Sequence, residues 1–497
     1  MSATGALEEL RRHPRHLVLG GLVAGLLAVP LPPRAILLLA LAAAALAGRS
    51  GLALLAATAV LAGAIGGQLR LAALDRTQLP PLIGRTVAAD VTLLEQPRPV
   101  QYGSTVLVQL RALASEGHYV DGAGERVMVR IREAIAWPAA ATGAVVRVKG
   151  RLRALGPFEQ HYARKGAHAA ITIDAAAPTG ARRGGAWGLV DEIRGRAEHA
   201  LSQGLQRPQA ALLRGMVLGQ DEALSERTRD EFRASGLSHI LAASGQNVAL
   251  LLALALPLLT VAGLGLRPRL SAALALIALY VPLAGGGPSI QRAGVMGAAT
   301  TVAALAGRAA SRWYALLLAA AATLALNPRA SGDPGWQLSF VAVVAIALAT
   351  PALSARLRRR RVPVAVADAA AMSLAATLGT APLLALHFEQ LSLVSLPANM
   401  LAAAAIAPIM WLGMLAAALG QLAAPLALPL NLLNAFLLGF VGAVAHTAAA
   451  IPHANLRVGL PGPVALATVY AVLAGLVVLV RRRRPPPDPA RDRRRRR

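Results

Sequence analysis

The sequence predicts a polytopic α-helical membrane protein of about 12 transmembrane helices, with a small OB-fold-like β-barrel domain inserted between the first helices and the rest. Three observations lead to this fold class. The chain of 497 residues is 56% hydrophobic but only 3% aromatic, and it is rich in Ala and Leu. Apolar runs fill both ends of the chain. Between them, about 100 residues alternate polar with apolar side chains, as β-strands do.

Residues 1–79 are predicted to form an N-terminal anchor of three membrane helices. Three apolar runs lie between residues 16 and 69, separated by "PLPPR" and "GRSG". Each run is close to the shortest length that crosses a bilayer. The basic and apolar start resembles a signal peptide, but further apolar runs follow at once, so we expect an uncleaved first span.

Residues 80–176 are predicted to form the β-domain. Five stretches with a period of two are separated by Gly, Pro and Asp: "TVAADVTLL", "STVLVQLRAL", "ERVMVRIRE", "AVVRVKGRL" and "HAAITID". Five short strands in so few residues are typical of a small closed or nearly closed barrel of OB-fold size.

Basic residues in two of these strands alternate with Val and Ile, which places them on one face. A basic face with a few aromatic residues suits single-stranded nucleic acid, because cations follow the phosphates and rings stack on bases. An ordinary solvated strand face is the alternative, since acidic residues occur in the same stretch. The candidate DNA-binding residues are Arg130, Arg132, Arg147, Lys149 and Arg151.

The rest of the chain divides into three parts. Residues 177–236 are a linker with amphipathic segments, such as "LSERTRDEFRAS", which we expect at the membrane surface. Residues 237–480 hold about nine further apolar runs and form the predicted multi-span domain. Residues 481–497 are an Arg-rich tail, which we expect to be disordered and to contact lipid.

Arginines in the short loops predict the orientation. If all twelve segments cross, seventeen arginines flank the inner side, against four in the outer short loops (Arg34, Arg292, Arg329 and Arg457). Basic residues accumulate on the cytoplasmic side of membrane proteins. The sequence therefore predicts a multi-pass protein of the bacterial plasma membrane, with both termini in the cytoplasm and the β-domain outside it.

Four polar clusters interrupt the apolar runs at their predicted outer ends. Polar groups at membrane depth usually face a cavity or another helix, and broken helices present their termini to a water-filled path. Helix capping or inter-helix hydrogen bonding is the alternative for any single residue. Gly245 is the predicted break in "SGLSHILAASGQNV". The candidate pore-lining residues are His239, Ser244, Gln246, Asn247, Ser289, Gln291, Arg292, Trp336, Gln337, Ser339 and Asn399.

The sequence offers no catalytic motif. It has no GxxxxGK[ST] loop and no HExxH, its histidines are scattered, and it has no cysteine. We therefore expect no catalytic residue, no metal, no cofactor and no ATPase activity.

The polar clusters resemble the signatures of the ComEC-type competence protein family. "SGLSHILAASGQNV" is similar to its S-G-x-S-H-L-L-A-x-S-G-x-H-V pattern, and "GGGPSIQRAG" to its G-x-x-P-S-x-x-R-A segment. "DPGWQLSF" and "FEQLSLVSLPAN" are similar to two further segments, in the same order. A three-span start followed by an OB-like domain with "GPFEQHYARKGAHA" also looks like the family's N-terminal half.

The resemblance implies an inner-membrane channel that passes one strand of incoming DNA into the cytoplasm during natural transformation. Its implied partners are single-stranded DNA, membrane lipid, a separate DNA receptor, a cytoplasmic helicase and a separate nuclease. The chain departs from the family at Asn247, where His is common, and at Gln246. It ends in an Arg-rich tail where many members carry a metallo-β-lactamase-like domain, so we expect no nuclease activity. The lack of cysteine also excludes the disulfide of some members.

Two other classes of protein stay open. A transporter of another solute would need a compact, closed substrate site. A polytopic membrane enzyme would need clustered acid and base groups, for which only the nearby His387 and Glu389 are candidates.

Overall fold

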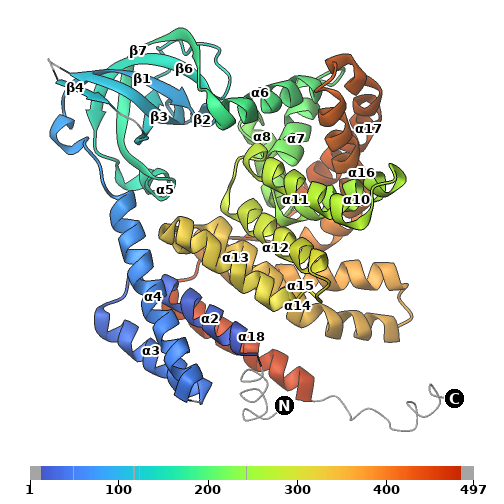
Figure 1. Ribbon diagram of the computed structural model, residues 1–497. Helices are drawn as coiled ribbons and strands as arrows, with labels where there is room; N and C mark the ends of the chain where they lie inside the picture. The colour runs from blue at the N-terminus through green and yellow to red at the C-terminus, as the bar shows by residue number, and fades with distance from the viewer. Residues whose placement is uncertain (1–12, 49, 116–117, 122–123, 242, 483–497) are drawn as a thin grey trace.

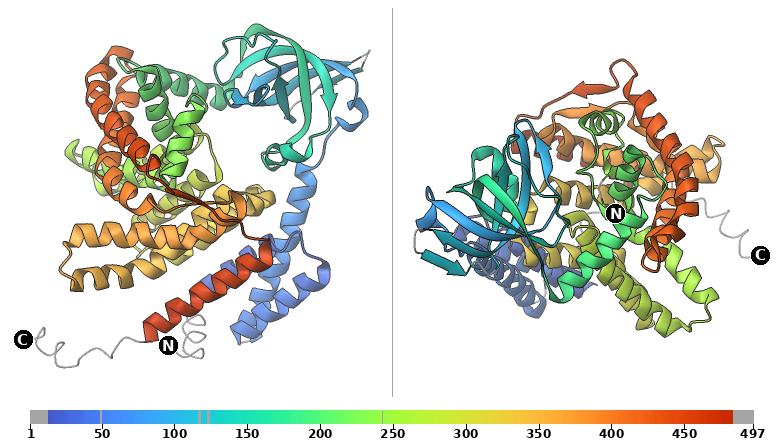
Figure 2. Two further views of the ribbon diagram at one scale, coloured as in Figure 1. Left: turned by 180° about the vertical axis from the view of Figure 1, so that it is seen from behind. Right: turned by 90° about the horizontal axis from the view of Figure 1, so that it is seen from above.

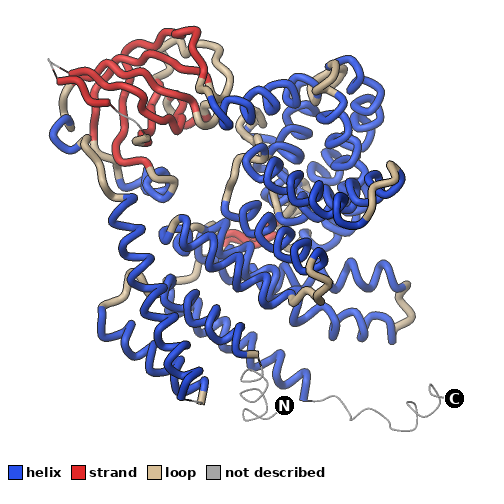
Figure 3. The backbone as a smooth tube through the Cα atoms, in the orientation of Figure 1, coloured by secondary structure: helices blue, strands red, loops and turns tan. Residues whose placement is uncertain are grey.

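The computed structural model describes residues 13–48, 50–115, 118–121, 124–241 and 243–482 (Figure 1). A β-domain stands at one end of the long helix α4, and nearly everything else is helical (Figure 3). Seen from above, the β-domain lies beside a bundle that contains helices α6 (Gly185–Ala200), α7 (Arg207–Leu218), α16 (Ser395–Leu419) and α17 (Leu428–Ala449) (Figure 2). Most of the predicted tail, residues 483–497, lies outside the described residues, as do residues 1–12.

The three N-terminal apolar runs form helices that pack through small residues. They are α2 (Pro14–Leu27), α3 (Pro33–Ala47) and α4 (Ser50–Leu74). A Cβ on Gly25 would lie 2.0 Å from the carbonyl oxygen of Val60, and one on Gly63 would lie 2.3 Å from that of Leu22. Glycine therefore lets the backbones of α2 and α4 approach closely, which is how membrane helices associate where apolar burial gives no driving force.

The β-domain is a sheet that closes on itself. Strand β1 pairs with β6, β6 with β7, β7 with β5, β5 with β3, and β3 again with β1; only β5 and β7 are parallel. Inward-facing Val, Leu and Ile residues fill the interior. The strands are β1 (Thr86–Leu93), β2 (Arg98–Val100), β3 (Gly103–Ser115), β4 (His118–Asp121), β5 (Arg126–Ile131), β6 (Ala144–Arg153) and β7 (Ala167–Arg182), with α5 (Gln160–Arg164) before β7.

The end of β7 differs from the sequence prediction. The strand continues past residue 176, because β6 is long enough to pair with it as far as Arg182. The extra residues lead directly into α6 (Gly185–Ala200).

Helix α7 (Arg207–Leu218), within the predicted linker of residues 177–236, lies inside the helical bundle. Eight of its residues are buried: Ala210, Ala211, Leu212, Leu213, Gly215, Met216, Val217 and Leu218. Apolar residues surround the helix instead of following one stripe, so it packs inside the bundle with α16 and α17. Helix α8 (Glu226–Ala234) is charged and buries only Phe232, as a surface helix does.

All nine apolar runs of the third part contain helices. Among the described residues, six helices of the chain are long and apolar enough to cross a membrane: Gly51–Leu74, Leu266–Leu283, Pro334–Arg359, Val364–His387, Ser395–Leu419 and Ala424–Ala449. The helices of this part are α9 (Ser238–Leu241), α10 (Gly245–Val261), α11 (Leu266–Leu283), α12 (Pro288–Leu305), α13 (Arg312–Leu326), α14 (Pro334–Arg359), α15 (Val364–His387), α16 (Ser395–Leu419), α17 (Leu428–Ala449) and α18 (Pro463–Arg482).

Short elements join some of these helices. The 3-10 helix η3 (Pro328–Gly332) connects α13 to α14. Strands β8 (Gln390–Ser392) and β9 (Asn455–Arg457) pair with each other at the ends of α15 and α17. The start of α2 and the end of α18 lie on the side of the helices away from the β-domain (Figure 1).

Candidate functional site

Four of the five predicted DNA-binding residues lie on the outer face of strands β5 and β6, and the fifth, Arg132, directly follows β5. On β6, Arg147, Lys149 and Arg151 are exposed and alternate with buried residues. On β5, Arg130 is half-buried. Strand β7 runs between these two strands, with Thr172 opposite both Arg130 and Arg151. The predicted alternation therefore brings these residues onto one curved surface.

Carboxylates neutralise part of this surface. The guanidinium of Arg147 donates two hydrogen bonds to Asp90, at 2.7 and 2.9 Å, and holds the pKa of that carboxyl below its usual value. Arg132 lies 3.9 Å from Asp174. Within the described part of the chain, Arg130 and Lys149 make no ion pair, so their positive charge is less compensated than that of Arg147.

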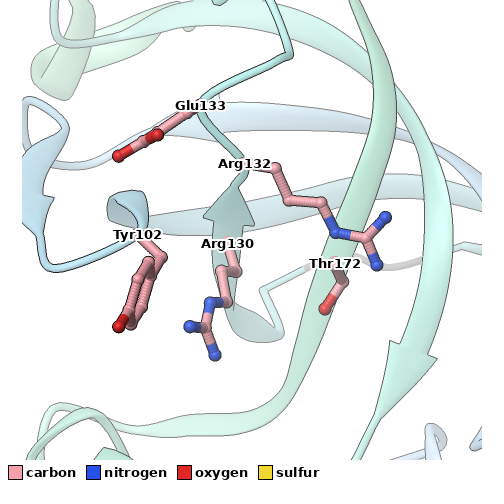
Figure 4. Close-up of a pocket in the computed structure, with 5 residues that line it drawn as sticks. All are labelled: Tyr102, Arg130, Arg132, Glu133 and Thr172. Atoms are coloured by element: carbon pink, nitrogen blue, oxygen red, sulfur yellow. The ribbon is translucent and has the colours of Figure 1, made fainter.

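A shallow pocket of about 470 Å³ opens beside Arg130 (Figure 4). It is lined by Tyr102, Arg130, Arg132, Glu133 and Thr172. The ring of Tyr102, which is 66% exposed, stands next to the Arg130 side chain, whereas Glu133 points away. A cation beside an accessible ring can hold a phosphate and its base at once.

A second exposed ring lies on the loop between β6 and β7. Phe158 is 96% exposed. The next residue, Glu159, accepts hydrogen bonds from Arg153, one of them 2.7 Å long, which fixes the base of the loop. Alternation could not identify Phe158 because it lies outside the strands. The feature of the sequence that could have identified Phe158 is a large aromatic residue in a turn, between Gly-Pro and Glu, where neighbouring residues in the sequence offer no apolar cover.

Two of the polar helix starts meet at Arg292. Its Nε donates to the hydroxyl of Ser339 on α14 at 2.7 Å, and Ser339 is hydrogen-bonded to Ser289 on α12 at 3.0 Å. The remaining contacts of the guanidinium are Met296 Sδ at 3.5 Å and the Phe340 ring at 5.7 Å. Arg292 is only 6% exposed, yet no ion pair joins it to a carboxylate of the described residues.

The start of α10 meets the same guanidinium. Helix α9 ends at Leu241 and α10 begins at Gly245, so the chain breaks where the sequence predicts. A Cβ on Gly245 would lie 2.7 Å from Arg292 Nη2. The Ser244 hydroxyl points to the Asn247 side chain and caps no backbone amide. Three helix starts, of α10, α12 and α14, thus surround one cation.

Asn247 has internal partners. Its Nδ2 donates to the carbonyl of Met216 at 2.8 Å and to the Tyr280 hydroxyl at 3.3 Å, and the residue is 6% exposed. These bonds tie α10 to α7 and α11. Its predicted place in a pore stays a prediction, while the neighbouring Gln246 is exposed.

Gln337 forms a separate polar group. It is hydrogen-bonded to His387 of α15 at 2.8 Å and donates to the Ser331 carbonyl at 2.8 Å. Trp336 is buried, and its Nε1 donates to Thr323 at 3.0 Å.

The structure does not bring the remaining candidates into these groups. Gln291 donates to the carbonyl of Gly286, two residues before the start of α12, at 2.6 Å. His239 is exposed, and Asn399 is half-buried, its side chain making no hydrogen bond to another described residue.

The β-domain is attached near the start of α14. Asn327 donates to the Arg164 carbonyl of α5 at 2.9 Å, and Arg164 donates to the Gly332 carbonyl. Arg329 also binds α5, through the carbonyl of Ala163, and pairs with Asp75 after α4. The loop that carries Phe158 therefore belongs to the part of the β-domain that contacts the helices. Among the described residues, no three His, Cys, Asp or Glu side chains gather in a way that could hold a metal ion.

Comparisons with known proteins give two matches. A family model described as "Competence protein" matches residues 216–483. The ComE operon protein 3 of Bacillus subtilis (strain 168) is 27% identical over 190 residues, which is 38% of this chain and 24% of that protein. The alignment thus spans about a quarter of the curated relative. No solved structure matches.

Proposed function

Because this chain belongs to the competence protein family, with more than half of it matched, we propose that it is an inner-membrane channel for single-stranded DNA. Family membership supports a role in DNA uptake during competence. The proposal adds the channel itself, the single-stranded form of the DNA and the path that the strand follows.

The observation that carries the proposal is the buried Arg292 without a carboxylate. An arginine at the centre of a membrane helix costs about 2.5 to 3.5 kcal/mol on insertion scales, so it is normally paired. Here the positive end of α10 lies beside it and adds to the same unbalanced charge. A phosphate that passes this point supplies the missing negative charge. Because a single guanidinium binds a phosphate less tightly than a cluster of cations does, the phosphate would be attracted and then released.

The closed sheet supports an OB-like receiver for the strand. OB-folds are five-stranded Greek-key barrels that bind oligonucleotides on the face of their second and third strands and with the flanking loops. The corresponding strands here are β3 and β5. Arg130 lies on β5, Tyr102 just before β3, and Phe158 in the loop before β7. Phosphates would lie along the less compensated cations and bases on the two rings.

The docking of α5 supports a short transfer from this receiver to the helices. Its contacts with Asn327 and Arg329 hold the β-domain at the end of the helices where α14 begins. Ser339 of the Arg292 group lies less than two turns into α14. The strand would thus leave the β-domain beside the polar helix starts.

We assign the β-domain to the outside of the plasma membrane and both termini to the cytoplasm. The start of α2 and the end of α18 on the far side of the helices support this orientation (Figure 1). Helix α12 and the shorter apolar helices would then also cross, which gives the predicted count of about 12. A channel of this kind would need no catalytic residue and no cofactor in this chain. A cytoplasmic helicase would pull the strand, a separate receptor would deliver it and a separate nuclease would degrade its complement.

Uptake of fluorescent DNA by cells with and without this gene tests the proposal. We expect Arg292→Met to abolish uptake, Gln291→Leu to reduce it, and Arg267→Met, at an exposed arginine far from the path, to leave it unchanged. Immunoblots of membranes check that the variants are present in equal amounts. Normal uptake without the gene, or with Arg292→Met, contradicts the proposal.

A further inference from the structure

A second pocket lies at the other end of the helices, where α2 begins and α12 is joined to α13. Its volume is about 590 Å³. Its polar lining residues are His13, Arg15, His16, Thr300, Arg308, Ser311 and Tyr314. The rest of the lining is almost entirely small or apolar, including Ala299, Ala303 and Leu318.

Hydrogen bonds and a ring contact hold the residues at the polar end of this pocket in place. His16 is hydrogen-bonded to the Ser311 hydroxyl at 3.1 Å, and its ring meets the Tyr314 ring edge-on at 5.5 Å. Ser311 also caps α13 by accepting from the Tyr314 amide at 3.3 Å. These contacts hold the start of α2 against the start of α13.

The described residues that line the pocket carry positive charge and include no carboxylate. Arg15 and Arg308 are exposed, no carboxylate lines the pocket, and neither arginine forms an ion pair within the described ranges. Two arginines on different segments thus line one space to which no carboxylate of the described residues contributes.

The pocket lies at the end of α13 opposite to the β-domain. The 15 residues of α13 rise about 22 Å. Its last residue leads into η3, which holds α5, while its first residue follows Ser311 of the pocket. The polar end of the pocket therefore lies where the helices leave the membrane, and the apolar lining extends toward the membrane interior.

We propose that this pocket binds the headgroup of an anionic phospholipid. The lipid phosphate lies between Arg15 and Arg308, and one acyl chain lies along Ala299, Ala303 and Leu318. Basic pockets between membrane helices favour such headgroups. An inorganic phosphate would use the cations but not the apolar wall, and a nucleic acid strand would have no partner for its bases there. This inference is independent of the proposed channel.

Native mass spectrometry of the purified full-length protein tests the site. Phosphatidylglycerol and phosphatidylcholine are added in parallel, and the bound fraction is measured. We expect a preference for phosphatidylglycerol, and Arg15→Ala with Arg308→Ala should weaken its binding about 30-fold, from about fivefold for each arginine. The matched control is Arg359→Ala with Arg360→Ala, two exposed arginines at the end of α14 that are outside the pocket. This control should bind the lipid like the unaltered protein.

Further measurements separate the lipid from other ligands. Ala303→Trp fills the apolar wall and leaves both charges, so it should also lower phosphatidylglycerol binding. Inorganic phosphate and a single-stranded oligonucleotide should not displace the lipid. Equal binding of both lipids, equal losses in the control, or displacement by the oligonucleotide would each overturn the proposal. If the variant with both arginines replaced unfolds, the result for Ala303→Trp and the displacement experiment decide whether the pocket binds the lipid.

Discussion

If the β-domain binds DNA as proposed, the salt dependence of binding should differ between its cations with and without an ion-pair partner. Arg130 and Lys149 make no ion pair among the described residues, whereas Arg147 binds Asp90 through two hydrogen bonds and Arg132 lies 3.9 Å from Asp174. Each phosphate contact on single-stranded DNA contributes about 0.7 to the slope of log K against log salt. Replacing Arg130 and Lys149 by Ala should therefore reduce the slope by about 1.4.

This change in slope is large enough to measure. Between about 50 and 200 mM salt, the unaltered protein should lose about sevenfold more affinity than the double variant. Fluorescence anisotropy of a labelled oligonucleotide with the full-length protein in nanodiscs gives both slopes. The matched variant, Arg132→Ala with Arg147→Ala, removes the same formal charge but frees two carboxylates.

The two double variants should differ in the salt dependence of their DNA binding. Arg132 and Arg147 already have carboxylates beside them, so their loss should flatten the slope less. Asp90→Asn should steepen it, because it frees the Arg147 charge. If the variant without Arg132 and Arg147 flattens the slope as much as the variant without Arg130 and Lys149, charge compensation does not decide where DNA binds.

Three further predictions concern single side chains. Phe158→Ala should leave the melting temperature unchanged, because the ring is 96% exposed, and should weaken oligonucleotide binding about 5- to 150-fold if a base stacks there; equal affinity in anisotropy would contradict this. Gly245→Ala should reduce DNA uptake, because its Cβ would lie 2.7 Å from Arg292 Nη2 and displace the guanidinium, whereas Gly442→Ala, with open space around it, should not. Hydrogen bonds from Arg153 hold the pKa of Glu159 below its usual value, so the stability that this pair contributes should be lost as the pH falls through the lowered pKa; thermal unfolding at decreasing pH should show a smaller acid loss in Glu159→Gln.

The local sequence pattern predicted the helices and strands better than the contacts that these elements make with one another. Apolar runs indicated the helices, alternation indicated the main strands, and the glycine in "ASGQNV" indicated the start of α10. Each of these depends on neighbours in sequence. The salt bridge between Arg147 and Asp90 depends on the register of β1 against β6, which no single strand contains.

Long-range contacts explain the remaining differences. Asn247 is buried because its amide reaches a carbonyl in α7, 31 residues earlier in the chain. The same holds for α7 itself, whose burial is decided by α16 and α17, about 200 residues later. The meeting of three helix starts at Arg292 also requires the packed bundle. The resemblance named the polar clusters, but only the structure separates the Arg292 group from the Gln337 group.

The short helices α2 and α13 have a consequence for the membrane around this protein. They pack together through Val23, Leu26, Leu316 and Leu324. With 14 and 15 residues they rise about 21 and 22 Å, against about 30 Å for a typical hydrocarbon core. In the proposed arrangement both helices cross, and a bilayer that follows them would be thinned on this side, at a cost of a fraction of a kcal/mol for each ångström of mismatch. The acyl chain length of the surrounding lipids should therefore affect the stability of this protein, which should be highest in thin membranes.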